Sequence, residues 1–335
     1  MTPEQHAAKI RELEKPMSEA YLADIRASES AMTIAEVERL LERSDREELV
    51  TLFSLSGWAL FTELVRSAFI QGARNQYARF DTNTWAVNAA LMQMYQSIND
   101  HFRYDLRNTV RAVAEDGGSF RSQAIDLLGV RSGSMPFRTG GMAGMYGDYT
   151  QYVLNARRQL RSANPAQLRD YLRRRNRDTA FDNAVKRIAL RMEEARKKAK
   201  QQGLPEPDKP AMSAKDADKI AKGYAKKMSA KNAERIAQHW ATTAYNSGRY
   251  NAVKQQIEKG LIAEGDVEKR WQTMRDERVR HSHSVLQGKR AAMSEPFVSG
   301  LGGRMLYPCD QSLGASDADI YGCRCSIEYT IKRRG

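Results

Sequence analysis

The chain has 335 residues, 54 Lys and Arg against 41 Asp and Glu, a formal net charge of +13 and 41% hydrophobic residues. One hydrophobic core rarely organises a chain of this length, so we expect two or three structural units. The most apolar stretch, 49–65, is short and interrupted by polar residues, which excludes a bilayer-spanning helix. The sequence starts without a signal-peptide pattern, and three cysteines are too few for a disulfide framework. We therefore expect a protein without a membrane anchor that is made in a reducing cytosol.

Residues 1–130 predict an N-terminal helical region. Thr33 with Glu36, and Ser44 with Glu47, each fit the capping box in which a hydroxyl and a carboxylate satisfy free amides at a helix start. Apolar residues then recur every three or four positions over 84–114, which predicts a long helix. The resulting part of the molecule is expected to be elongated and built from several helices.

A glycine-rich loop is predicted at 131–147. Five glycines in this segment permit positive φ angles and disfavour helix. The segment lacks the Gly-Lys-Ser/Thr ending of a phosphate-binding P-loop, so nucleotide binding is disfavoured. We expect either a mobile loop or an extended contact with another chain.

A basic helical segment follows at 148–202, with Asn164 and Pro165 as a helix start signal. Between residues 157 and 200 there are 15 basic and 5 acidic residues, so most of the net charge is concentrated here. Such a block favours a polyanionic partner, most often DNA phosphate. A helix face that is only exposed to solvent would have the same basic composition. The candidate DNA-binding residues are Arg157, Arg158, Arg161, Arg173, Arg174, Arg175, Arg177, Lys186, Arg187, Arg191, Lys197 and Lys198.

Three prolines within 205–210 predict a linker at 203–212. Helical patterning resumes over 213–260, a region that leads into the C-terminal domain. After Gly260 the sequence changes to short β-prone runs at 269–274, 304–307 and 325–331, which predict a small α+β domain over 261–335. The predicted fold class is therefore mainly α, with an elongated multi-helix N-terminal region and a small α+β C-terminal domain.

The C-terminal quarter carries an ordered set of residues that helix or strand packing does not require. The set is Trp271, Thr273, Asp276, Arg278, Arg280, His283, Leu286, Gly288, Pro308, Cys323, Arg324 and Cys325. It resembles the C-terminal domain of phage Mu F-like head morphogenesis proteins, also called minor head or minor capsid proteins. Their pattern runs roughly W-x-T-x2-D-x-R-x-R-x2-H-x2-L-x-G, followed by C-x-C, and the resemblance is close over about residues 231–331.

This resemblance implies a bacteriophage virion protein of the head, near the portal vertex, that is present in the host cytoplasm during procapsid assembly. The implied partners are the phage portal protein, the major capsid or scaffolding protein, and double-stranded DNA during packaging or delivery. No catalytic residue and no enzymatic activity are expected. One departure concerns Gln238, His239 and Trp240, which replace the Arg-Thr-Glu usual in the family, so the role of those family residues here is open.

The cysteines and histidine of this set allow a metal site. Zinc held by Cys309, Cys323, Cys325 and His283 is chemically reasonable in a small domain, but the spacing matches no known zinc finger, and Cys309 departs from the family pattern. Buried free thiols beside a core histidine are the simpler interpretation, and we favour a domain without cofactor. A disulfide from Cys309 to Cys323 or Cys325 is a further alternative.

Two alternative functions use the same residues. Asp276, Arg280 and His283 would suit a phosphodiesterase or toxin-like enzyme, since a histidine near a carboxylate can transfer protons and arginine binds phosphate. We instead expect them to stabilise the 271–288 turn through Asp–Arg pairing, with Cys323 and Cys325 packed close by. A nucleic-acid-binding protein unrelated to virions is the other alternative.

Overall fold

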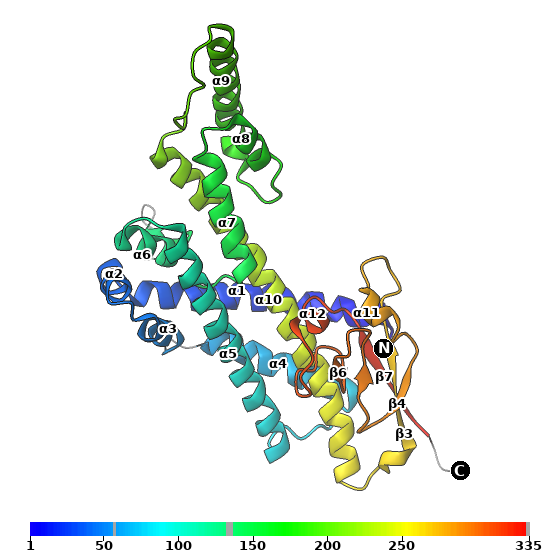
Figure 1. The fold of residues 1–335 in the computed structure, drawn as a ribbon. Helices are drawn as coiled ribbons and strands as arrows, with labels where there is room; N and C mark the ends of the chain where they lie inside the picture. Colours follow the sequence, from blue (N-terminus) through cyan, green and yellow to red (C-terminus); the bar gives the residue numbers. More distant parts are fainter. Residues whose placement is uncertain (56–57, 132–136, 333–335) are drawn as a thin grey trace. The chain divides into compact units, whose positions relative to one another are not determined.

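A computed structural model describes residues 1–55, 58–131 and 137–332 of the chain. It is mainly helical, and most of its short antiparallel strands lie after residue 260 (Figure 1). This confirms the predicted fold class of a mainly α protein with a small α+β C-terminal region. Within the described ranges, none of the helices combines the length and the apolar character needed to cross a membrane.

Six helices form the first part of the described chain. They are α1 (Pro3–Ala31), α2 (Ile34–Glu42), α3 (Arg46–Leu55), α4 (Ala59–Gln76), α5 (Trp85–Asp116) and α6 (Phe120–Leu128). Thr33 closes the predicted capping box at α2, because its side chain accepts from the amide of Glu36 and the Glu36 carboxylate accepts from the amide of Thr33. The second predicted capping box is wrong. Ser44 has a positive φ of 58°, and the carboxylate of Asp45 instead accepts from the amide of Glu48.

The middle of the chain contains a two-stranded ribbon and four helices. The elements are β1 (Val130–Arg131), β2 (Arg138–Thr139), α7 (Gly147–Leu160), α8 (Pro165–Leu172), a short 3-10 turn (Thr179–Phe181), α9 (Asp182–Gln201) and α10 (Ala214–Glu258). Asn164 caps α8 as predicted, with Pro165 at its first position. The predicted linker 203–212 forms neither helix nor strand. Part of the predicted glycine-rich loop, 132–136, lies outside the described residues.

The C-terminal part is a small antiparallel arrangement. Its elements are a 3-10 turn (Glu264–Asp266), β3 (Val267–Gln272), α11 (His281–Ser284), β4 (Arg290–Ala292), β5 (Phe297–Val298), β6 (Arg304–Met305), α12 (Asp317–Ile320) and β7 (Ser326–Ile331). One sheet has the strand order β4-β3-β7, and β5 pairs with β6 in a second. Strand β3 is central, and its register with β7 pairs Trp271 with Ile327 and Gln272 with Ser326.

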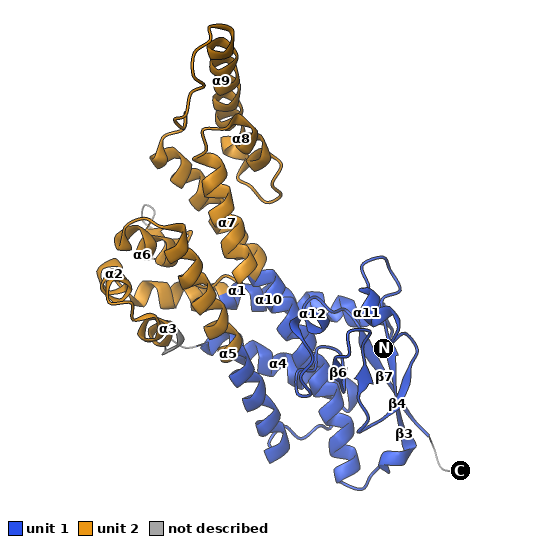
Figure 2. Ribbon diagram, in the orientation of Figure 1, with its two compact units in different colours: residues 1–21, 58–98, 233–335 blue, residues 22–57, 99–232 orange. Residues whose placement is uncertain are grey.

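Contacts divide the chain into two compact units, each assembled from distant segments (Figure 2). Unit 1 comprises residues 1–21, 58–98 and 233–335, and unit 2 comprises 22–57 and 99–232. Helices α1, α5 and α10 each contribute residues to both units. The C-terminal sheet therefore shares its unit with the start of the chain, whereas the predicted basic segment belongs to unit 2.

In unit 1, helices α4 and α10 approach so closely that glycine is required on both. A Cβ at Gly248 would lie 1.9 Å from the carbonyl oxygen of Phe69, and a Cβ at Gly72 would lie 2.1 Å from the carbonyl oxygen of Tyr245. His6 of α1 is also buried here, with its Nε2 3.1 Å from Oδ1 of Asn246 on α10. The second half of α10 is thus a central support of this unit.

In unit 2, a buried arginine joins three elements. The Arg157 guanidinium of α7 donates to both carboxylate oxygens of Asp126 on α6, at 2.7 and 2.5 Å. It also lies 3.6 Å from Asp116 on α5 and 3.7 Å from Asp218 on α10. Since Arg157 is only 8% exposed, its charge depends on these three carboxylates for compensation.

Candidate functional site

The strongest cluster of chemically active side chains lies in the C-terminal part of unit 1. Its residues come from three places: His283 from α11, Asp319 from α12, and Cys323 and Cys325 from the turn that leads into β7. Trp271 of β3 packs against the His283 ring, with centroids 5.6 Å apart. The hydrophobic core around them contains Trp271, Leu286, Phe297, Met305, Cys309, Ile320, Tyr321, Cys323, Cys325 and Ile327.

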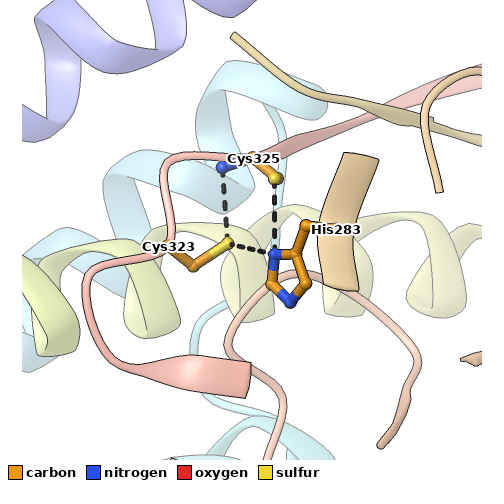
Figure 3. A group of neighbouring side chains, drawn as sticks. All are labelled: His283, Cys323 and Cys325. Atoms are coloured by element: carbon orange, nitrogen blue, oxygen red, sulfur yellow. Dashed lines mark hydrogen bonds between the residues drawn. The ribbon is translucent and has the colours of Figure 1, made fainter. Parts of the chain in front are cut away.

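One nitrogen of His283 faces two sulfurs (Figure 3). Nδ1 lies 3.4 Å from Sγ of Cys323 and 3.7 Å from Sγ of Cys325. The backbone amide of Cys325 donates to Sγ of Cys323 at 3.4 Å, which fixes the turn between the two cysteines. The three side chains are buried, and their potential ligand atoms all lie within 4.8 Å of one another. A histidine nitrogen and two sulfurs at these separations form a set that can hold a metal ion.

The other nitrogen of His283 faces a carboxylate. Nε2 lies 3.6 Å from Oδ1 of Asp319, and both side chains are about 1% exposed. Within the described chain, neither Nε2 nor either oxygen of Asp319 has a hydrogen-bond partner. Asp319 was not predicted from the sequence, because the four residues of α12 are too few to show which side chains of the helix are buried.

Cys309 belongs to the same core but lies apart from the His283 nitrogen. Its thiol donates to the carbonyl of Ile320 at 3.2 Å, and its backbone has a positive φ of 66°. A hydrogen bond with Cys309 lowers the pKa of the Cys323 thiol, whereas burial raises the pKa of Cys309 and the hydrogen bond to Cys323 raises the pKa of Cys325. All three cysteines are free thiols in this structure.

The charged residues of the motif connect the 271–288 turn to the segment 318–325. Asp276 pairs with an arginine outside the 271–288 turn. Its two carboxylate oxygens accept from Arg324 at 2.7 and 2.8 Å. Arg280 donates to the carbonyls of Ala318 and Tyr321. Arg278 is exposed, and its amide donates to Asp276 at 3.1 Å. The side chains of Asp276, Arg280 and His283 therefore each contact the later segment rather than forming one acid–base group.

The remaining motif residues serve the turn and the core. The Thr273 hydroxyl and amide both donate to Oε1 of Gln287, at 2.6 and 2.7 Å. Gly288 has a φ of +75°, and its amide donates to the carbonyl of Trp271. Leu286 and Pro308 are buried. These contacts close the 271–288 turn, which starts at the end of β3 and includes α11.

The departure at 238–240 also has a packing role. The His239 ring stacks on Tyr321 with centroids 4.1 Å apart and lies 2.9 Å from the side-chain nitrogen of Gln311. Trp240 is 2% exposed. These two residues of α10 pack within unit 1, next to the segment that carries the cysteines, where the family pattern has a charged pair.

The basic segment divides into paired and exposed residues. Beyond buried Arg157, ion pairs join Arg158 to Asp116, Arg161 to Asp218, Arg173 to Asp170 and Arg177 to Asp182, while Arg174 donates to Gln159. The exposed candidates outside these contacts are Arg175, Lys186, Arg187, Arg191, Lys197 and Lys198. All but the first of these lie on α9.

The pattern of the C-terminal residues has a counterpart among known families. Residues 211–328 match the family model described as Phage Mu protein F like protein. No curated protein and no solved structure matches the chain. The matched range contains every motif residue whose contacts are described above, including the His283 cluster and the Asp276–Arg324 pair. Over residues 211–328, about a third of its length, the chain therefore matches the Phage Mu protein F like family.

Proposed function

We propose that this chain is a phage head morphogenesis protein that acts at the portal vertex during procapsid assembly and DNA packaging. The observation that carries the proposal is the family match over 211–328, together with the way the matched motif closes into one core. Its mode of action is binding rather than catalysis. In support, Asp276 and Arg280 use their side chains in contacts that hold the 318–325 segment.

We propose that double-stranded DNA is contacted by the outer face of α9. Lys186, Arg187, Arg191, Lys197 and Lys198 are exposed and recur at helical spacing, with Glu194 as the acidic residue among them. Lysine and arginine on one helix face can follow the phosphate backbone without reading its sequence. Arg157 is left out of this surface, because its guanidinium is buried against three carboxylates.

A protein partner, the portal or a coat subunit, is proposed to bind unit 1 beside the start of α5. Trp85 is 84% exposed there, and Met92 on the same helix is 66% exposed. Trp85 borders a cavity of about 270 Å³ that is also lined by Trp240, Tyr250 and Tyr307. Exposed tryptophan next to a concave apolar surface is typical of the anchor residues of protein interfaces.

Complementation in the encoding phage genome tests the proposal. With the gene deleted, we expect defective heads or heads without DNA, and restoration by the wild-type gene. Mass spectrometry of purified particles should detect the chain in the restored particles. Normal, infectious heads without the gene, or particles that never contain the chain, would contradict the proposed function.

Two variants separate the proposed surfaces. Trp85→Ala should reduce incorporation of the chain into heads, whereas Lys197→Gln with Lys198→Gln should leave incorporation intact and reduce DNA content. A nuclease assay with and without chelator addresses the enzymatic alternative, and metal-dependent cleavage of DNA or RNA by the purified chain would favour it over binding.

A further inference from the structure

We propose that His283, Cys323 and Cys325 bind a zinc ion, with Asp319 as the group that orients the histidine. The site lies in the core of the C-terminal part and goes beyond the proposed role in head morphogenesis. Its three ligands are Nδ1 of His283 and the Sγ atoms of the two cysteines. Cys309 is not one of them.

The two nitrogen–sulfur separations fit a tetrahedral zinc site. Zinc lies about 2.3 Å from sulfur and about 2.0–2.1 Å from histidine nitrogen, so a tetrahedral arrangement places sulfur and nitrogen about 3.5 Å apart. The observed separations from Nδ1 are 3.4 Å to Cys323 and 3.7 Å to Cys325. Figure 3 shows both sulfurs beside Nδ1 of His283, and all three side chains are buried. The ligand positions therefore need little movement to accept the ion.

The arrangement of lone pairs also favours a cation. A neutral imidazole has one N–H and one nitrogen lone pair, so Nδ1 can form one good hydrogen bond in its ring plane. Two sulfurs nevertheless face this single atom. If one thiol donates a hydrogen bond to Nδ1, no second lone pair remains on that nitrogen to accept from the other thiol. A metal ion at the centre uses the nitrogen lone pair and both sulfurs at once.

Asp319 supplies an independent observation. A metal-bound histidine commonly donates its second N–H to a carboxylate, which sets the tautomer and makes the nitrogen a better ligand. Here Nε2 lies 3.6 Å from Oδ1 of Asp319, and within the described residues neither Nε2 nor the carboxylate has a hydrogen-bond partner. Burying an ionisable pair that is about 1% exposed costs free energy, unless the groups pair with each other or serve a metal ion. A metal ion at Nδ1 would account for this pair, because Asp319 would then orient the histidine ring toward the ion.

The fourth position is assigned to solvent. A cavity of about 10 Å³ borders the cluster and is lined by the three ligands together with Met274, Arg278, Val279, Arg280, Gly322 and Arg324. This is about the smallest cavity that can hold one water molecule. The Cys309 thiol donates to the carbonyl of Ile320 and interacts with the Cys323 thiol, but its sulfur is not among the ligand atoms that lie together around Nδ1. The proposal thus distinguishes Cys309 from two cysteines that are equally buried.

The test measures metal in the full-length chain. Protein produced with zinc in the medium and purified without chelator should contain stoichiometric zinc by inductively coupled plasma mass spectrometry. Removal of the metal should lower the unfolding temperature, and zinc added back should restore it. Cobalt in place of zinc should give the thiolate-to-metal absorption of a tetrahedral site. Wild-type protein that retains no zinc and shows no such absorption would overturn the proposal without reference to any variant.

Matched substitutions locate the ligands. Cys323→Ser and Cys325→Ser should lose stoichiometric zinc, whereas Cys309→Ser, the same change at a similar depth, should retain it. Asp319→Asn should keep the ligands but weaken zinc affinity by about 10- to 100-fold, as removal of such an orienting group does elsewhere. Equal zinc loss in all three cysteine variants would contradict the assignment, as would unchanged affinity in Asp319→Asn.

Discussion

The two units of this protein hold their interiors together in different ways. Unit 2 buries a full positive charge, Arg157, among three carboxylates, while most other basic residues of its 157–200 segment face solvent or form ion pairs. Unit 1 also buries two cations, Lys269 and Arg249, but these donate to uncharged oxygens, Lys269 to the carbonyls of Glu295 and Leu306 and Arg249 to the Gln76 side chain. Unit 1 relies in addition on close helix contact at Gly72 and Gly248. The comparison teaches that a high density of charged residues in a sequence is no guide to where charge is buried. It also predicts different sensitivities for the two units.

The largest effect is expected at Arg157. Arg157→Ala would leave Asp126, Asp116 and Asp218 without their common partner, and removal of one member of a buried ion pair costs about 3–5 kcal/mol in the free energy of unfolding. Arg175→Ala, at an exposed position of the same segment, should change that energy by less than about 0.5 kcal/mol. Urea unfolding of both variants provides the measurement. Equal stability of the two would remove Arg157 from its structural role.

Acid should act on unit 1 through His6. Burial, and after it the charge of Arg249, lowers the pKa of His6 from 6.5 to about 4. Because the folded-state pKa lies below that of the unfolded chain, this stability is complete above pH 6.5 and is lost as the pH falls toward 4. The loss amounts to about 3 kcal/mol.

The substitution His6→Gln should reduce this acid dependence, because glutamine takes up no proton. Between pH 6.5 and pH 4 the wild-type protein should lose about 3 kcal/mol more unfolding free energy than the variant, so the difference between the two stabilities should change across this window. Parallel curves over the whole window would show that His6 does not titrate as proposed.

Gly248→Ala should weaken the packing of α4 on α10. The added methyl would meet the Phe69 carbonyl, so one helix must shift, and overpacking of this kind typically costs about 1–3 kcal/mol. Gly265→Ala is the matched control, because a Cβ there meets no atom within 4 Å. A clear difference between the two melting temperatures is expected. Indistinguishable values would mean that α4 and α10 are not packed together as described.

The exposed face of α9 should affect DNA binding and leave stability unchanged. Lys197→Gln with Lys198→Gln should flatten the dependence of log K on log salt by about 0.9 for each phosphate that the helix no longer neutralises. Lys254→Gln with Lys259→Gln removes the same charge from unit 1 and should leave the slope as it is. Fluorescence anisotropy with a DNA duplex at several salt concentrations provides both slopes. The same change of slope in both variants would indicate a response to net charge instead of a surface on α9.

The smallest effect is expected at the Asp276–Arg324 pair. The Asp276 side chain is 40% exposed and that of Arg324 is 18% exposed, so water and salt screen their attraction. Asp276→Ala should therefore lower the melting temperature only slightly, and less in high salt. A destabilisation as large as that of Arg157→Ala would show that the pair supports the fold far more than its exposure indicates.

The sequence alone determined the features that depend on local chemistry. Thr33, Asn164 and the prolines at 205–210 mark helix ends by rules that involve only neighbouring residues, and helical periodicity identified the long helix that became α5. The order of Trp, Asp, Arg, His and Cys after residue 270 indicated the family, because the motif is defined by residue types and spacings in the sequence alone.

The tertiary structure decided which residues meet and which are buried. Arg157 and Arg175 are indistinguishable in a basic segment, and only packing against α5, α6 and α10 places the first in the interior. The choice of Arg324 as the partner of Asp276, the approach of Asp319 to His283 and the hydrogen bond from Cys309 to the Ile320 carbonyl depend on contacts between segments about 10 to 50 positions apart. No local rule fixes contacts over such separations, since they follow from how β3, β7 and the connecting turns close around one core.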